Sequence, residues 1–120
     1  IAQWMGASRE VIISLAPKSV TNAIAIEITG HLGGIPSLTA YIVVLVGLLG
    51  AVVGLKVLSF GNISSPVAQG ISMGTAAHVI GTSRVNQLSE RYGAYATVGL
   101  ILNGVLTSVL AGPLLEILGV

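Results

Sequence analysis

The stretch LAPKSVTNAIAIE, residues 15–27, places a proline, a lysine and several polar side chains inside a sequence that is otherwise apolar on both sides. Pro17 has no N–H to donate and its ring collides with the preceding turn, so a helix that begins near Val11 is expected to stop or kink there. Ser19 and Thr21 are candidate caps for a helix that restarts through NAIAIEI. The stretch therefore predicts two helical pieces separated by a polar break.

The composition of the chain is that of an integral membrane protein. Of its 120 residues, 53% are hydrophobic and 8% are charged, whereas soluble domains carry roughly 25% charged residues. Uncharged stretches cover residues 32–55, 57–83 and 92–115, and each is longer than the roughly 20 residues that cross a hydrocarbon core. We therefore expect a lipid bilayer around the chain. The net charge of +1 gives no reason to expect nucleic acid as a partner.

Four apolar segments predict the architecture. They cover residues 11–31, interrupted at Pro17 and Lys18, then 38–58, 67–84 and 94–118. The second and fourth are suited to complete spans, and the third is too rich in Gly, Ser and Thr to face lipid all round. We expect an all-α, polytopic membrane helical bundle with two interrupted (discontinuous) helices and about two continuous transmembrane helices. Residues 1–120 are expected to form a single membrane domain.

Small residues and a weak internal similarity add to this plan. Gly50 with Gly54, and Gly70 with Gly74, have the G-x-x-x-G spacing that lets helix backbones approach closely. A duplication of the first two segments into the last two is also compatible with the sequence. A shift of 54 positions superposes Thr21 on Thr75, Ala23 on Ala77, Tyr41 on Tyr95 and Gly50 on Gly104.

The second polar stretch is GISMGTAAHVIGTSR, residues 70–84. In one continuous helix, Thr75, His78 and Thr82 would share a face, with Gly74 and Gly81 nearby. A histidine at membrane depth normally faces a bundle interior or a water-filled cavity. The stretch is therefore either part of a binding site or the source of an interhelical hydrogen bond. Asn103, near the middle of the last segment, leaves the same two interpretations open.

A helix that starts inside the membrane offers unpaired N–H groups and a partial positive charge, and a lysine beside it favours a small anion. The other interpretation is that Pro17 only kinks a helix while Lys18 extends to the headgroups. The candidate substrate-binding residues are Lys18, Ser19, Thr21, Thr75, His78, Thr82 and Asn103. The candidate helix-break residues are Pro17, Gly74 and Gly81.

Catalysis, metal binding and cofactors are not expected. The chain has no cysteine, and its only histidines are His31 and His78. Glu27 and His31 form one i, i+4 pair without a second. No G-x-S-x-G nucleophile elbow occurs.

Four segments carry a resemblance that covers nearly the whole chain: APKSVTNAIAIEI, GGIPSLTAYIVVLVGLLGA, AQGISMGTAAHVIGTSR and LNGVLTSVLAGPLL. They resemble the C-terminal half of the LrgB/CidB family of bacterial membrane proteins, which also includes the plastid glycolate/glycerate translocator. The chain departs from the family pattern at Ala77, at Ser83 and at Asn22, which replaces a small or hydroxylated residue.

The resemblance implies a multi-pass protein of the bacterial cytoplasmic (inner) membrane, or of the plastid envelope in a plant. It also implies a homo-oligomer and an LrgA/CidA-type membrane partner. Two functions follow from it. One is the transport of a small monocarboxylate, a small organic anion of the pyruvate, glycolate or glycerate class. The other is an antiholin-like or holin-like role in murein hydrolase export and autolysis, as an oligomeric pore or pore modulator.

Overall fold

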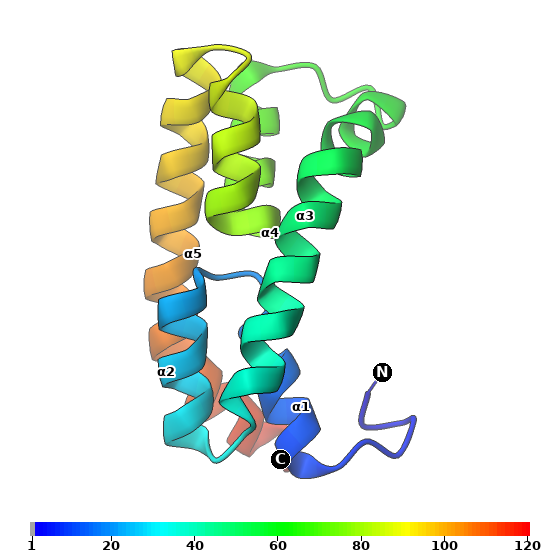
Figure 1. Cartoon of the computed structure of the whole chain (residues 1–120), viewed down its shortest axis with the longest axis vertical. Helices are drawn as coiled ribbons and strands as arrows, with labels where there is room; N and C mark the ends of the chain where they lie inside the picture. Colours follow the sequence, from blue (N-terminus) through cyan, green and yellow to red (C-terminus); the bar gives the residue numbers. More distant parts are fainter. Residues whose placement is uncertain (1) are drawn as a thin grey trace.

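The computed structural model describes residues 2–120, which form helices and connecting segments without a β-strand (Figure 1). The expected all-helical class is therefore confirmed for this part of the chain. The helices, in chain order, are α1 (Arg9–Leu15), α2 (Asn22–Leu32), α3 (Pro36–Phe60), α4 (Pro66–Asn86) and α5 (Glu90–Ile117).

Two of these helices, α3 with 25 residues and α5 with 28, have the length and apolar composition that a membrane crossing requires. They coincide with the segments 38–58 and 94–118 in which the sequence predicts complete spans. Their outward faces are apolar and largely uncovered, as Val52 on α3 and Val105 on α5 illustrate with exposed fractions of 70% and 59%. Apolar side chains exposed in this way are suited to lipid or to further protein.

The first polar stretch separates α1 from α2. Helix α1 ends at Leu15, its last turn is closed by the N–H of Ala16, and the buried Pro17 follows. The chain then turns, and α2 runs back beside α1 toward the end of the molecule at which α3 begins (Figure 1). The left-handed conformation of Gly33, with φ of 81°, ends α2.

Hydroxyl groups tie α1, α2 and the start of α3 together. The hydroxyl oxygens of Thr29 and Thr39, both buried, lie 2.9 Å apart. Thr39 also donates to the carbonyl oxygen of Ser14 at 2.9 Å, and the Ser14 hydroxyl oxygen accepts the N–H of Ile35 at 2.7 Å. These bonds satisfy polar groups that are buried among apolar helices, and they fix the α1–α2 pair against α3.

Helix α4 does not continue straight through the second polar stretch. Ala77 (φ −124°, ψ 18°) and His78 (φ 42°, ψ −137°) have non-helical backbone conformations, and the chain folds back on itself there (Figure 1). A Cβ added at Gly81 would lie 2.6 Å from the carbonyl oxygen of Met73. Eight residues of straight helix would separate these positions by about 12 Å, so the two arms of α4 lie side by side.

Glycines allow the arm of α4 that enters the reversal to pack closely on both long helices. A Cβ at Gly74 would overlap the backbone carbonyl of Ala96 on α5, and one at Gly54 would lie 2.6 Å from the sulfur of Met73. The two G-x-x-x-G pairs of the sequence are therefore engaged in contacts within this chain: the pair on α3 faces α4, and the pair on α4 faces α5.

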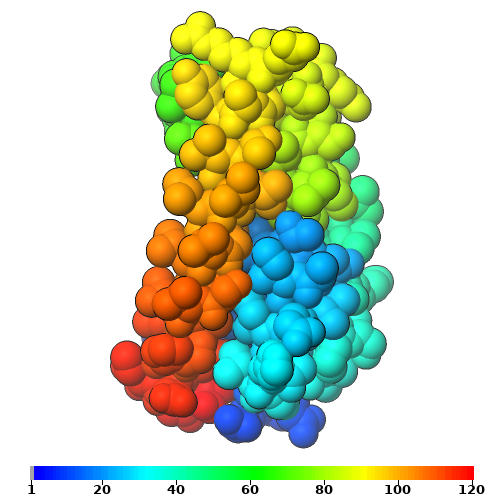
Figure 2. Space-filling model, turned by 90° about the vertical axis from the view of Figure 1, so that its left-hand side faces the viewer, coloured from blue at the N-terminus to red at the C-terminus, as the bar shows by residue number. Residues whose placement is uncertain are grey.

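The α1–α2 pair and the folded α4 occupy opposite halves of the molecule. Figure 1 shows α4 along the upper parts of α3 and α5, and α1 with α2 along their lower parts. The space-filling view agrees, with α2 packed beside the lower half of α5 (Figure 2). The shift of 54 positions places α2 on residues 76–86, which hold the reversal and the returning arm of α4, and places α3 on residues 90–114, inside α5. The elements therefore recur in the same order.

Candidate functional site

Asn103 joins the two places where the helices are interrupted. It lies within α5 and is partly buried. Its side-chain Nδ2 donates to the carbonyl oxygen of Ser19, in the α1–α2 break, at 2.9 Å, and to that of Thr75, two residues before the α4 reversal, at 3.0 Å. Of the two interpretations of Asn103, the bridging one is observed. The bridge brings together residues that are 56 positions apart in the chain.

The start of α2, three residues after Ser19 in the chain, offers unpaired N–H donors. Thr21 is the N-cap, its side chain makes no capping hydrogen bond, and its carbonyl oxygen accepts the N–H of Ala25 at 2.9 Å. The N–H groups of the first turn have no partner inside the helix. Lys18 is exposed next to this turn, and its Nζ donates to the Ser19 hydroxyl oxygen at 3.3 Å. The arrangement favours negative charge at the start of α2.

The hydroxyls of the second stretch are bonded within α4. Thr75 donates to the carbonyl oxygen of Ile71 at 2.9 Å, and Thr82 donates to that of His78 at 2.9 Å. Because the chain reverses between Thr75 and Thr82, these side chains do not lie on one face of a continuous helix, and that expectation is wrong. Thr75 lies on the arm that enters the reversal, and Thr82 on the arm that leaves it.

His78 lies at the reversal itself and is 3% exposed. Its Nε2 lies 2.8 Å from the carbonyl oxygen of Val43 on α3, so this nitrogen carries the proton and donates. A Cβ at Gly47 would lie 2.5 Å from the His78 ring, which shows how closely the imidazole packs on α3. The interhelical hydrogen bond considered from the sequence is therefore present.

The interruptions differ in how closely they follow the expected break residues. Pro17 comes two positions after the end of α1. In α4 the backbone departs from helical geometry at Ala77 and His78, between the two glycines expected to break it. Gly74 and Gly81 serve instead as positions of close packing, because neither would accommodate a side chain without overlap.

One buried polar atom at the start of α2 was not predicted from the sequence. Oδ1 of Asn22, the first residue of α2, is buried and has no hydrogen-bond partner among residues 2–120. In the sequence, Asn22 stands out only because it departs from the family pattern. No rule of helix capping or periodicity would have indicated that its oxygen is left without a donor.

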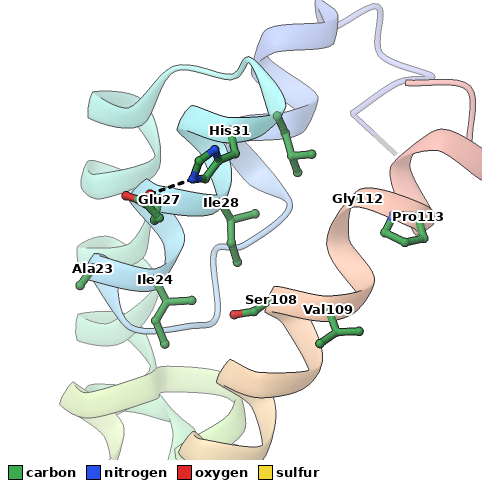
Figure 3. A pocket seen from close by; sticks show the side chains of 10 residues that line it. Ala23, Ile24, Glu27, Ile28, His31, Ser108, Val109, Gly112 and Pro113 are labelled. Atoms are coloured by element: carbon green, nitrogen blue, oxygen red, sulfur yellow. Dashed lines mark hydrogen bonds and ion pairs between the residues drawn. The ribbon is translucent and has the colours of Figure 1, made fainter.

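A cleft of about 570 Å³ lies between α2 and the last turns of α5 (Figure 3). Ala23 and Ile24, next to the break, line one end of the cleft, and Gly112 and Pro113 contribute to its α5 wall. Glu27 lies on the α2 side, where its Oε1 is 2.8 Å from Nε2 of His31. Within residues 2–120, no group of three or more metal-ligating side chains is present.

The fold and site define an all-helical protein with two helices suited to a membrane and two helix interruptions joined by an asparagine. The LrgB-like family model matches residues 1–117, so the chain belongs to this family, and the resemblance noted in the sequence is confirmed.

The relatives are bacterial proteins with holin-like or unassigned names. Holin-like protein CidB of Staphylococcus aureus is 37% identical over 105 residues, which are 88% of this chain and 46% of that protein. The uncharacterized protein YwbG of Bacillus subtilis is 39% identical over 107 residues, 89% of this chain and 48% of that protein. The chain thus spans about half the length of the curated relatives it matches. No solved structure matches.

Proposed function

We propose that the chain forms the substrate-binding part of a secondary carrier for a small monocarboxylate of the pyruvate, glycolate or glycerate class. The observation that carries the proposal is the bridge from Asn103 to the carbonyl oxygens of Ser19 and Thr75. Carriers with discontinuous helices bind their substrates where such interruptions lie near mid-membrane. Both interruptions here adjoin the same residue of a long apolar helix.

The proposed membrane arrangement follows from the two halves of the molecule. Helices α3 and α5 cross the cytoplasmic membrane, the α1–α2 pair enters from one side, and the folded α4 enters from the other. An inverted repeat of this kind underlies alternating access in many carriers. Residues 1–120 then form one membrane domain, corresponding to the C-terminal half of a longer carrier.

The proposed site has an anion-binding side and a supporting side. The carboxylate of the substrate meets the free N–H groups at the start of α2, with Lys18 as countercharge and Ser19 and Thr21 beside it. On the supporting side, Asn103 holds the two interruptions together and His78 fixes the α4 reversal to α3. Thr75 and Thr82 complete that side, where their hydroxyls hold the arms of α4 in shape.

The cleft between α2 and α5 provides a path to this site. It extends from Ala23 and Ile24, in the first turn of α2, along the helix to His31 and Leu32 at its other end. Because a small monocarboxylate is far smaller than a cleft of about 570 Å³, the cleft admits the substrate with its hydration water.

The second candidate is a holin-like pore or pore modulator, which the name of the staphylococcal relatives favours. In that function the chain forms a homo-oligomer or associates with an LrgA/CidA-type membrane partner. Such an oligomer needs close contacts between helices of different chains, to which G-x-x-x-G pairs are suited. Both pairs already face helices of the same chain, so contacts between chains would have to use other surfaces.

The carrier is tested by replacing Lys18 with glutamine in the intact protein and measuring uptake of labelled glycolate and pyruvate into proteoliposomes. Lys18→Gln removes the countercharge, so saturable uptake should fall at least about tenfold, the equivalent of one charge-assisted hydrogen bond. Lys56→Gln is the matched control, because Lys56 is exposed near the end of α3 and far from both interruptions along the chain. Uptake by Lys18→Gln at the level of the control would reject the proposed role of Lys18.

A further inference from the structure

Three of the five Lys and Arg residues lie at one end of the molecule, called the basic end from here on. Lys56 is in the last turns of α3, Arg84 is near the end of α4, and Arg91 is in the first turn of α5. Each of them has a chain neighbour in or against one apolar cluster, namely Leu55, Val85 and Tyr92. The three basic side chains are exposed, and within residues 2–120 none of them is in an ion pair with a carboxylate.

The opposite end of the molecule carries mainly acidic side chains. At this end α1 begins, and α2 and α5 end (Figure 1). Glu10 is in the first turn of α1, Glu116 is in the last turn of α5, and Glu27 is on α2. Arg9 is the basic residue at this end, because Lys18 lies in the break between α1 and α2. The two ends of the molecule therefore differ in the sign of their charge.

The reversal of α4 is what brings the basic residues together. If residues 67–84 formed a complete span, Lys56 and Arg84 would lie on opposite sides of the membrane. The chain instead turns back in the middle of α4, so this helix begins and ends at the basic end (Figure 1). Both ends of α4 contact the start of α5, since a Cβ added at Gly70 or at Gly93 would meet atoms of the other helix.

The charge difference between the ends indicates how the molecule is oriented. Lys and Arg residues close to membrane spans are retained on the cytoplasmic side, whereas acidic residues have little effect. Anionic lipids of the cytoplasmic leaflet also attract basic side chains. Building on the membrane arrangement of the proposed function, we propose that the basic end is the cytoplasmic face, where Lys56, Arg84 and Arg91 contact anionic phospholipid headgroups. The α1–α2 pair then enters from the outer side, toward which the His31 and Leu32 end of the cleft is directed.

Single cysteines test the orientation directly, because the chain has no cysteine of its own. Ser37→Cys and Ser64→Cys are a matched pair: both serines are exposed, Ser37 in the first turn of α3 and Ser64 in the linker before α4. In intact bacterial cells that express the whole protein, a membrane-impermeant maleimide should label Ser37→Cys. Labelling of Ser64→Cys should be absent until the cells are permeabilised.

A second arm tests whether the basic residues set the orientation. Replacing all three of them with glutamine in the Ser64→Cys background should produce molecules of both orientations, so that part of the protein is labelled in intact cells. The matched control replaces three acidic residues of the opposite end with glutamine and should leave the labelling unchanged: Glu10, Glu27 and Glu116.

Labelling of Ser64→Cys but not of Ser37→Cys in intact cells would overturn the proposal. So would an unchanged orientation after the basic residues are neutralised. Labelling of both cysteines from the same side would reject the crossing of α3 and, with it, the orientation. The labelling does not depend on transport, so loss of uptake in proteoliposomes would reject the carrier while the orientation stands.

Discussion

At the scale of single residues, Asn103 does most to define the site. Its amide group donates to two backbone carbonyls from different interruptions, and its own Oδ1 accepts from Thr107 at 3.4 Å. In a low-dielectric environment, a carbonyl oxygen that loses its donor is costly to leave buried. The side chain therefore acts as a cross-link between segments that the chain itself keeps far apart.

Replacing Asn103 with leucine should destabilise the protein by about 1–3 kcal/mol, because the carbonyl oxygens of Ser19 and Thr75 lose a donor. The measurement is the free energy of unfolding in detergent micelles. Thr97→Val is the matched control on the same helix, because the Thr97 hydroxyl donates to the carbonyl oxygen of Gly93 within its own helix. Equal stabilities of the two variants would contradict the bridging role of Asn103.

At the scale of elements, the folding back of α4 separates what the sequence predicts from what it does not. The end of α1 near Pro17 follows from the chemistry of proline, and α3 and α5 follow from long apolar runs. The reversal at Ala77 and His78 does not follow, since a histidine with φ of 42° has no local sequence signal. The stretch lacks proline, and its glycines lie three residues to either side of the turn.

The same limit applies to the candidate site. Lys18, Ser19 and Thr21 could be selected from the sequence because a break, a charge and capping residues coincide there. The contacts of His78 with Val43 and of Asn103 with both interruptions depend on how distant segments pack. The buried oxygen of Asn22 depends on the complete surroundings of one atom. Neither kind of information is contained in a local pattern.

The close packing of α4 on α5 leads to a specific prediction for Gly74. Gly74→Ala should destabilise the protein by about 1–3 kcal/mol, the typical cost of overpacking, because the added Cβ would overlap the backbone of Ala96. Gly30→Ala is the matched control in α2, where a Cβ meets no atom within 4 Å. Alanine there should stabilise the helix by up to about 1 kcal/mol. Thermal unfolding in micelles measures both, and a Gly74→Ala variant as stable as Gly30→Ala would contradict the packing.

At the scale of the whole molecule, two interrupted units from opposite ends meet at one side chain. The long apolar helices α3 and α5 have uncovered outer faces, and a cleft runs along α2 from the end where α2 and α3 join to the first turn of α2. A carrier and a holin-like pore differ in how such a molecule passes solutes. A carrier binds each substrate molecule and saturates, whereas a pore passes solutes according to their size.

The most direct test of the carrier is to reconstitute the intact protein in vesicles loaded with a large fluorescent dye, and to measure glycolate uptake and dye release together. The proposed function predicts uptake that saturates with glycolate concentration, that falls in Lys18→Gln, and that leaves the dye inside the vesicles. Release of the dye, together with non-saturating glycolate entry that Lys18→Gln leaves unchanged, would contradict it.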